Sequence, residues 1–164
     1  MYVNASLGVV IPAYNEAEFI GEVIETLPEY VDAAYVVDDH STDGTWEEIR
    51  NYARVEQSAP VDCTEESCQL LTTDGSGEQI TETEQNVAVT AVRHQTNRGR
   101  GAAVITGHRL AQQSDHDVIA VMDGDGQMDP EILHQIVKPV ATGTADYAKG
   151  NRLVRHVHPW ELSL

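Results

Sequence analysis

The chain has 164 residues, which is enough for one domain with a substantial core and leaves little room for a second. Its 27 Asp and Glu residues outnumber its 10 Lys and Arg residues, and the net charge of −17 repels nucleic acid, so a nucleic-acid partner is excluded. Hydrophobic residues make up 41% of the sequence, which also excludes a disordered polypeptide.

The acidic excess favours a halophilic source, because high salt screens dense like charge. Lys occurs only as Lys138 and Lys149, which fits that interpretation. An acidic face that binds a partner is the alternative. No apolar run approaches the ~20 residues of a membrane helix, and the N-terminus lacks a basic segment followed by an apolar stretch. A soluble cytoplasmic protein is therefore expected.

Strand and helix patterns alternate in the first part of the chain. Residues 7–11 form a continuous apolar run, which predicts a strand covered on both faces. Apolar residues then recur on one helical face over residues 19–27, and Asn15 with Glu18 predicts a cap for that helix.

A second strand is predicted at residues 33–37, followed by a helix over residues 46–53 that Ser41 or Thr42 is expected to cap. The pattern lapses at residues 55–85, which are rich in Glu, Gln, Ser, Thr and Gly. We interpret them as an acidic surface insertion that contains a hairpin and lies outside any ligand site.

Alternation resumes after the insertion, with strands predicted at residues 86–92 and 117–122 around a helix over residues 102–110. Asp129 followed by Pro130 predicts the start of another helix, because Asp caps well and Pro suits the first helical position. Pro139 is expected to distort the last turn of that helix and Gly143 to end it. The final predicted element is a short strand, at residues 145–149.

This order predicts a single α/β domain over residues 1–164, Rossmann-like, with a mostly parallel central sheet and helices on both faces. Ligands of such sheets bind beyond the carboxyl ends of the strands. Polar clusters follow three of the predicted strands, at residues 12–16, 38–45 and 123–127. All three are therefore expected to face one crevice.

The third cluster predicts a metal site. Asp123 and Asp125 are two residues apart, so in an extended segment their carboxylates converge, which is costly unless a cation lies between them. Oxygen ligands suit Mg²⁺ or Mn²⁺, with phosphate oxygens and water completing the shell, and Gln127 can add a neutral oxygen. Gly124 allows the backbone to approach a ligand closely. The alternative is a polar turn that caps the next helix, a task that Asp129 already performs.

The other clusters favour a nucleotide. The carboxylates of Asp38 and Asp39 can accept hydrogen bonds from a base and a ribose, although they can instead shape a turn. The ring of Tyr14 can pack beside a base. Residues 97–101 place glycines at a helix N-terminus, which favours an anion, and Arg152 is a further cationic candidate for a pyrophosphate.

Together these residues resemble the family 2 glycosyltransferases with the GT-A fold, and within them the polyprenyl-phosphate (dolichol-phosphate) hexosyltransferases. The resemblance implies inverting transfer of a hexose from a UDP- or GDP-sugar to an acceptor such as polyprenyl or dolichyl phosphate, with a divalent metal, at the cytoplasmic face of a membrane. The matching segments follow the family's order: VVIPAYNE, VVDDHSTDGT, NRGRGAAVITG, VMDGDGQMDP and YAKGNRL.

The resemblance also implies roles for single residues. Asp123 corresponds to the ribose and metal side of the acidic motif, with Gly124 beside it among the expected nucleotide-binding residues, and Asp125 and Gln127 correspond to its metal-binding positions. Asp125 and Arg152 are the implied catalytic residues, Arg152 as a cation near the diphosphate or the acceptor phosphate. The implied nucleoside contacts are Pro12, Tyr14, Glu16, Val37 and Asp39, with Asp38 beside them.

The sequence departs from the family after Arg152. Family members continue through acceptor-binding elements, whereas this chain stops at Leu164. A truncated chain that lacks the acceptor region is therefore expected, and a nucleotide-sugar-binding fragment without catalysis is the first alternative. The second is a sugar-nucleotidyltransferase, although the Gly-rich basic loop that would follow the first strand is missing.

Overall fold

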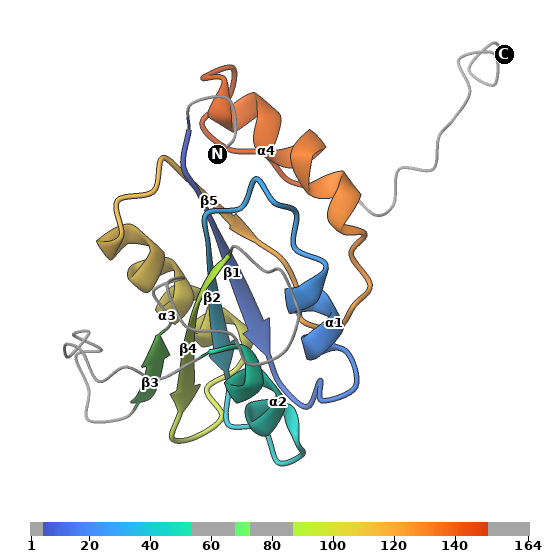
Figure 1. Cartoon of the computed structure of the whole chain (residues 1–164). Helices are drawn as coiled ribbons and strands as arrows, with labels where there is room; N and C mark the ends of the chain where they lie inside the picture. Colours follow the sequence, from blue (N-terminus) through green and yellow to red (C-terminus); the bar gives the residue numbers. More distant parts are fainter. Residues whose placement is uncertain (1–4, 54–67, 73–86, 151–164) are drawn as a thin grey trace, which may run out of the picture.

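A computed structural model describes residues 5–53, 68–72 and 87–150, and five strands of this part form one sheet in the order β3-β4-β2-β1-β5 (Figure 1). The last four in that order run parallel, and β3 pairs antiparallel with β4 at the edge. The carboxyl ends of the parallel strands therefore lie at the same end of the sheet. The strand bounds are β1 (Leu7–Ala13), β2 (Ala33–Asp38), β3 (Cys68–Thr72), β4 (Ala88–His94) and β5 (Val118–Val121).

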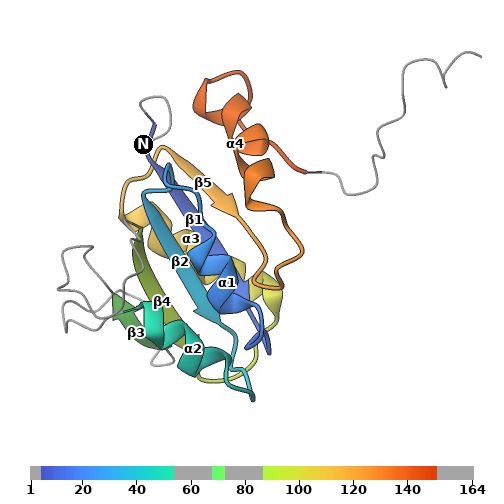
Figure 2. The same cartoon turned by 45° about the vertical axis from the view of Figure 1, so that its right-hand side comes forward.

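Helices cover both faces of the sheet, as predicted. Helix α3 lies on one face, and α1, α2 and α4 lie on the other (Figures 1 and 2). A short 3₁₀ helix, η1, leads into α4. The helix bounds are α1 (Ile20–Glu25), α2 (Thr45–Tyr52), α3 (Arg100–Gln113), η1 (Pro130–Ile132) and α4 (Leu133–Ala141).

The continuous apolar run of β1 is explained by burial on both sides, because all seven of its residues are buried. Val9 and Ile11 join the larger core beneath α1, α2 and α4, whereas Val10 packs with Leu110 beneath α3. Helix α3 approaches the sheet closely at Gly107, where an added Cβ would lie 2.4 Å from Val10 Cγ1. A larger residue at this position would push the helix away from the sheet.

The predicted caps of α1 and α2 are wrong, because the polar residues concerned make other contacts. Neither helix has a side-chain cap. Asn15 Oδ1 instead accepts from the backbone N–H of Thr42 at 2.9 Å, and Ser41 bonds to Asp38. The predicted start at Asp129 is confirmed, since its side chain accepts from the N–H of Glu131.

Helix α4 contains Pro139 and is followed by Gly143 at a φ of +69°, as the sequence predicts. The strand predicted at residues 145–149 is wrong, because these residues form no strand and the side chain of Tyr147 is 77% exposed. Within the predicted insertion, β3 adds an edge strand to the sheet. The other residues of 55–85 lie outside the described part of the chain. In the described part, no helix has the length and apolarity needed to span a bilayer.

Candidate active site

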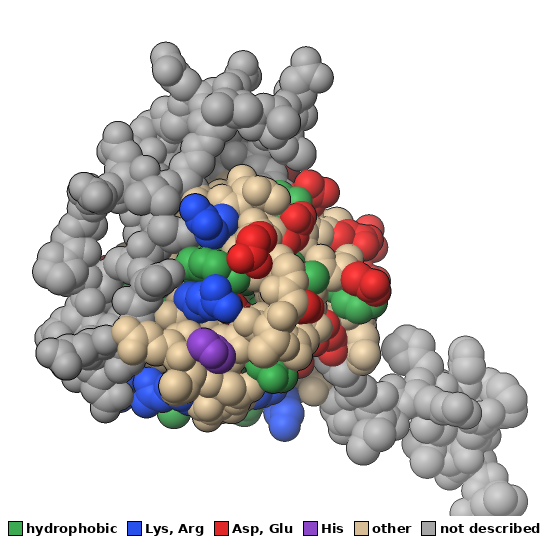
Figure 3. Space-filling view, turned by 90° about the horizontal axis from the view of Figure 1, so that it is seen from below, with side chains coloured by type: hydrophobic (Ala, Val, Ile, Leu, Met, Phe, Trp, Pro, Cys, Tyr) green, Lys and Arg blue, Asp and Glu red, His purple; other side chains and the backbone are tan. Residues whose placement is uncertain are grey.

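A cleft of about 310 Å³ lies where the parallel strands end. Figure 3 looks at the molecule from this end and shows Asp and Glu side chains gathered on one side of the face, with basic side chains beside them. The cleft brings together most of the residues predicted for the site: Pro12, Tyr14, Glu16, Asp39, Asp123, Gly124 and Asp125.

Hydrogen bonds between the loops after β1 and β2 hold one wall of the cleft. The N–H of Asn15 donates to Ser41 Oγ at 3.0 Å, and its side-chain oxygen accepts from Thr42. The N–H of Glu16 donates to Thr45 Oγ1 at 2.8 Å. These short polar side chains therefore lock two loops to each other, which fixes the positions of the cleft residues that they carry.

The backbone continues the parallel pairing beyond the strand ends. The N–H of Asp39 donates to the carbonyl of Ala13 at 2.9 Å, and the N–H of Gly124 donates to that of Pro12 at 3.3 Å. A Cβ on Gly124 would lie 3.1 Å from Ile20 Cδ1 and 3.2 Å from Pro12 O. The close approach that requires glycine here is thus to the protein itself, whereas the sequence suggested an approach to a ligand.

Asp38 does not line the cleft. Its side chain is fully buried, where Oδ1 accepts from the N–H of Ser41 at 3.0 Å and from its hydroxyl. Oδ2 forms an ion pair with Arg93 Nε at 3.0 Å. Val37 is also buried in the sheet and away from the cleft lining. These two residues support the site from behind, and their predicted contact with a nucleoside stays a prediction.

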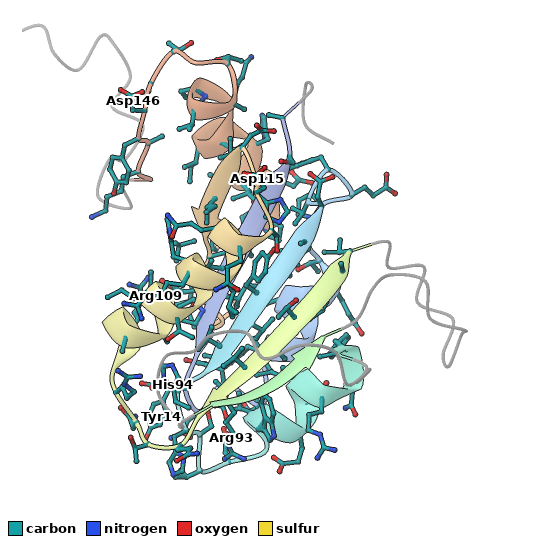
Figure 4. All side chains as sticks on the ribbon, turned by 90° about the vertical axis from the view of Figure 1, so that its left-hand side faces the viewer. Tyr14, Arg93, His94, Arg109, Asp115 and Asp146 are labelled. Atoms are coloured by element: carbon teal, nitrogen blue, oxygen red, sulfur yellow. The ribbon has the colours of Figure 1, made fainter. Side chains whose placement is uncertain are left out.

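Asp39 does line the cleft, although its residue exposure is only 2%. Its Oδ1 accepts from the N–H of Arg98 at 2.9 Å and lies 2.7 Å from His94 Nδ1. Tyr14 is 45% exposed beside it, at the same end of the sheet as His94 (Figure 4). A fixed carboxylate next to an exposed ring can bind a planar group that carries hydrogen-bond donors.

The acidic motif after β5 meets the N-terminus of α3. Arg100 donates from Nε and Nη2 to Asp123 Oδ1, at 2.8 and 2.5 Å. Asp125 Oδ1 accepts from the N–H of Gln127 at 3.0 Å. Desolvation raises the pKa of Glu16, and the nearby charges of Asp125, Asp43 and Asp123 raise it further. The loops therefore gather negative charge on one side of the cleft.

The donor set fits a hard divalent cation that also takes oxygens from its substrate. Asp123 and Asp125 both line the cleft, and carboxylate oxygens are preferred ligands of Mg²⁺ and Mn²⁺. Among the described residues no three His, Cys, Asp or Glu side chains come close enough to hold a metal by themselves. Mg²⁺ characteristically binds through one or two carboxylates plus substrate phosphates, so a two-carboxylate site suffices.

The last two predicted site residues are Gln127 and Arg152. Gln127 lies next to Asp125 through its backbone but does not line the cleft. Arg152 lies outside the described residues. Their predicted roles at the metal and at the diphosphate stay predictions.

Several cleft residues have no individual role predicted from the sequence. Residues 97–101, which the sequence predicts as an anion-binding segment at a helix N-terminus, contribute three of them. Thr106 and His94 lie behind the cleft lining, where His94 contacts both Asp39 and Thr106. In the sequence they differ from their surroundings only as polar residues in or next to apolar strand and helix patterns. The additional lining residues are Ala13, Asn97, Gly99, Arg100 and Ala103.

The parallel sheet and the carboxylate-lined cleft beyond its strand ends define a Rossmann-like α/β protein. The family model "Glycosyl transferase family 2" matches residues 8–62 and 72–163, and the chain therefore belongs to glycosyltransferase family 2.

Two curated proteins are similar to this chain in sequence. A UDP-N-acetylglucosamine–dolichyl-phosphate N-acetylglucosaminyltransferase from Methanococcus voltae is 29% identical over 145 residues, which cover 88% of this chain and 51% of that protein. A dolichol-phosphate mannosyltransferase from Pyrococcus furiosus is 27% identical over 153 residues, which cover 91% of this chain and 34% of that protein. The chain thus spans about half of the first relative and about a third of the second.

A solved structure confirms the predicted GT-A fold. The mannosyltransferase PcManGT from Pyrobaculum calidifontis, in complex with GDP-Man and Mn²⁺, superimposes with a TM-score of 0.52 at 23% identity. The match covers 84% of this chain and 32% of that one.

Proposed function

We propose that this chain is the donor-binding part of an inverting glycosyltransferase that moves a hexose from a UDP- or GDP-sugar to a polyprenyl or dolichyl phosphate. The observation that carries the proposal is the joining, in one cleft, of a fixed Asp39 with the two carboxylates of the acidic motif. The relatives named for transfer to dolichyl phosphate support the acceptor class.

Asp39 and Tyr14 would bind the nucleoside. The Asp39 carboxylate accepts hydrogen bonds, so it would favour the N–H groups of a base such as uracil or guanine. The exposed ring of Tyr14 offers an apolar face against which a base can pack. This arrangement orients the donor so that its diphosphate extends toward the acidic motif, which lines the same cleft.

Asp123 and Asp125 would hold Mg²⁺ or Mn²⁺. When bound, the cation supplies Lewis-acid stabilisation of the negative charge that develops on the leaving nucleoside diphosphate. The N-terminus of α3 also lines the cleft through Gly99 and Arg100, and the free N–H groups of a helix N-terminus favour a phosphate. Arg100 adds a positive charge on that wall.

The acceptor needs little help from a protein base. A phosphate monoester has a second pKa of about 6 and is therefore largely dianionic near neutrality. One of its oxygens can attack the anomeric carbon as the bond to the diphosphate breaks, which inverts that carbon. Arg152 is proposed to place the acceptor or the diphosphate, and a position at the cytoplasmic membrane surface and a halophilic source are part of the same proposal.

A thermal-shift panel of UDP- and GDP-sugars tests the donor class. Ligands that bind the native state raise its stability with the logarithm of their concentration over Kd. We expect one base series to raise the Tm, with a larger rise when Mn²⁺ is added, in high-salt buffer. Absence of any shift in a chain with a cooperative unfolding transition would overturn the proposal.

A turnover assay separates catalysis from binding alone. The chain would be incubated with the nucleotide sugar that stabilises it, Mn²⁺ and a short-chain polyprenyl phosphate, and release of the nucleoside diphosphate would be followed. Release that depends on the acceptor supports the transferase. Binding without release supports a donor-binding fragment, an alternative favoured by the share of the relatives that this chain spans.

A further inference from the structure

His94, the last residue of β4, lies behind the cleft and between two polar partners. Its exposure is 1%, its Nδ1 is 2.7 Å from Asp39 Oδ1, and its Nε2 is 2.9 Å from Thr106 Oγ1. Figure 4 shows the imidazole at the end of the sheet that carries Tyr14. A row of contacts therefore runs from α3, through the imidazole, to a carboxylate that lines the cleft.

The carboxylate of Asp39 fixes the direction of one of these hydrogen bonds. A carboxylate oxygen only accepts, so Nδ1 of His94 carries the hydrogen that points at Asp39. In the neutral imidazole Nε2 then accepts, and the Thr106 hydroxyl donates to it. In metal sites, a hydrogen-bond partner behind a ligating side chain fixes the orientation of that side chain, and His94 stands in the same relation to Asp39.

Within the part of the chain that the structure describes, the hydrogen bonds to Asp39 converge on one oxygen. Oδ1 receives both His94 and the N–H of Arg98, at 2.7 and 2.9 Å. Among the described residues, no hydrogen bond reaches Oδ2. Two donors on one oxygen fix the rotation of the carboxylate about its last bond, which gives Oδ2 a defined position in a residue that lines the cleft.

We propose that His94 is a positioning residue that sets the orientation of the Asp39 carboxylate for the nucleoside. This inference rests on the proposed function, because it takes Asp39 as the nucleoside contact. His94 acts through Asp39 and touches no ligand itself. Its contribution to nucleotide affinity therefore depends on the presence of the Asp39 carboxylate.

A pair of amide variants tests the hydrogen bond itself. The side-chain nitrogen of Asn reaches the position of Nδ1, whereas that of Gln reaches the position of Nε2. We expect His94→Asn to keep the Kd of UDP or GDP within about threefold, and His94→Gln to weaken binding by about tenfold or more, a typical cost of removing such a partner. Calorimetry with Mn²⁺ measures both, and the unfolding transition of each variant reports its fold.

A double-mutant cycle then separates positioning from packing. In the native background His94→Leu should weaken nucleotide binding about tenfold, and in an Asp39→Ala background it should add no further loss. If His94→Leu does not fold, the Asn and Gln variants still test the hydrogen bond to Asp39. Thr106→Val removes the partner on the other side of the imidazole, and its loss of nucleotide affinity should be smaller than that of His94→Gln.

The outcomes distinguish this inference from the proposed function. If the unmodified chain binds neither UDP nor GDP, the proposed function fails and the inference fails with it. If it binds but His94→Asn and His94→Gln bind equally well, the inference alone is overturned. An equal loss from His94→Leu with and without the Asp39 carboxylate would also overturn it, because His94 would then act independently of Asp39.

Discussion

Arg100 and Asp123 form an ion pair across the candidate site, in which two guanidinium nitrogens donate to a single carboxylate oxygen at 2.8 and 2.5 Å. The Arg100 side chain is 64% exposed and that of Asp123 is 29% exposed, so solvent screens the pair. Exposed pairs contribute about 0–1 kcal/mol. The guanidinium thus occupies an oxygen that the proposed cation would use, but it holds this oxygen weakly.

We predict that Arg100→Met increases the affinity for Mn²⁺ in the absence of nucleotide. The increase should not exceed about fivefold, because the pair that is removed contributes at most about 1 kcal/mol. Electron paramagnetic resonance titration of free Mn²⁺ measures this affinity. Arg109→Met is the matched control, because Arg109 lies on the same helix but away from the cleft lining (Figure 4). Unchanged or weaker Mn²⁺ binding by Arg100→Met would contradict the prediction.

Asp125→Asn should remove Mn²⁺-dependent binding of the nucleoside diphosphate without harm to the fold. The amide oxygen of Asn can still accept from the N–H of Gln127, and loss of the charge relieves repulsion of Glu16. The apo protein should therefore be at least as stable as the native chain. Calorimetry with and without Mn²⁺, together with thermal unfolding, measures both effects.

Asp129→Asn is the control for that change, since Asp129 caps η1 and Asn caps about as well as Asp. It should alter neither Mn²⁺-dependent binding nor stability appreciably. Full retention of Mn²⁺-dependent binding by Asp125→Asn would mean that the acidic motif does not hold the metal.

Glu16→Gln should stabilise the protein at neutral pH. The pKa of Glu16 in the folded state lies above its ordinary value of 4.5, first because of desolvation and then because of Asp125, Asp43 and Asp123. The folded state therefore holds this proton more tightly than the unfolded state, and stability falls as pH rises through that range. The advantage of the Gln variant should be largest above the raised pKa and should vanish below pH 4.5. Urea unfolding from pH 4 to pH 8 at constant salt checks the sign, and a variant that is less stable at neutral pH would contradict it.

Asp117→Asn should have the opposite pH dependence. Hydrogen bonds from the backbone N–H and the hydroxyl of Ser6, at 2.8 and 3.0 Å, hold the pKa of Asp117 below its ordinary value of 3.8. These bonds join the starts of β1 and β5, and their stabilisation is present above pH 3.8 and lost as pH falls through the lower folded pKa. The variant should therefore be less stable than the native chain at neutral pH and should approach it in acid. Equal stability at pH 7 would refute the assignment.

The sheet could be predicted from the sequence because its signals are local. Residues 7–11 and 33–37 are apolar throughout, and burial on both faces of a parallel sheet demands this pattern. The strand predicted at residues 145–149 is wrong, because five residues are too short a signal: among the described residues this segment pairs with no strand, and the Tyr147 side chain is exposed.

The site was only partly predictable, because its decisive contacts join distant segments. Asn15 has the chemistry of a helix cap, yet it bonds to Thr42, 27 residues away. His94 bonds to Asp39 across 55 residues. Polar residues offer several partners of similar energy, and only the tertiary fold selects one of them, whereas the convergence of Asp39 and Asp123 on one cleft follows from strand order.

The position of bound Mn²⁺ and nucleotide on the chain tests the proposed donor site most directly. Amide NMR signals would be recorded as Mn²⁺ is added in the presence of the preferred nucleoside diphosphate, with Mg²⁺ as the diamagnetic reference. We predict selective broadening at Gly124 and Asp125, with shifts at Tyr14, and no broadening at His116 and Asp117 near the opposite end of the sheet. Broadening centred away from the acidic motif, or none when both ligands are present, would contradict the account.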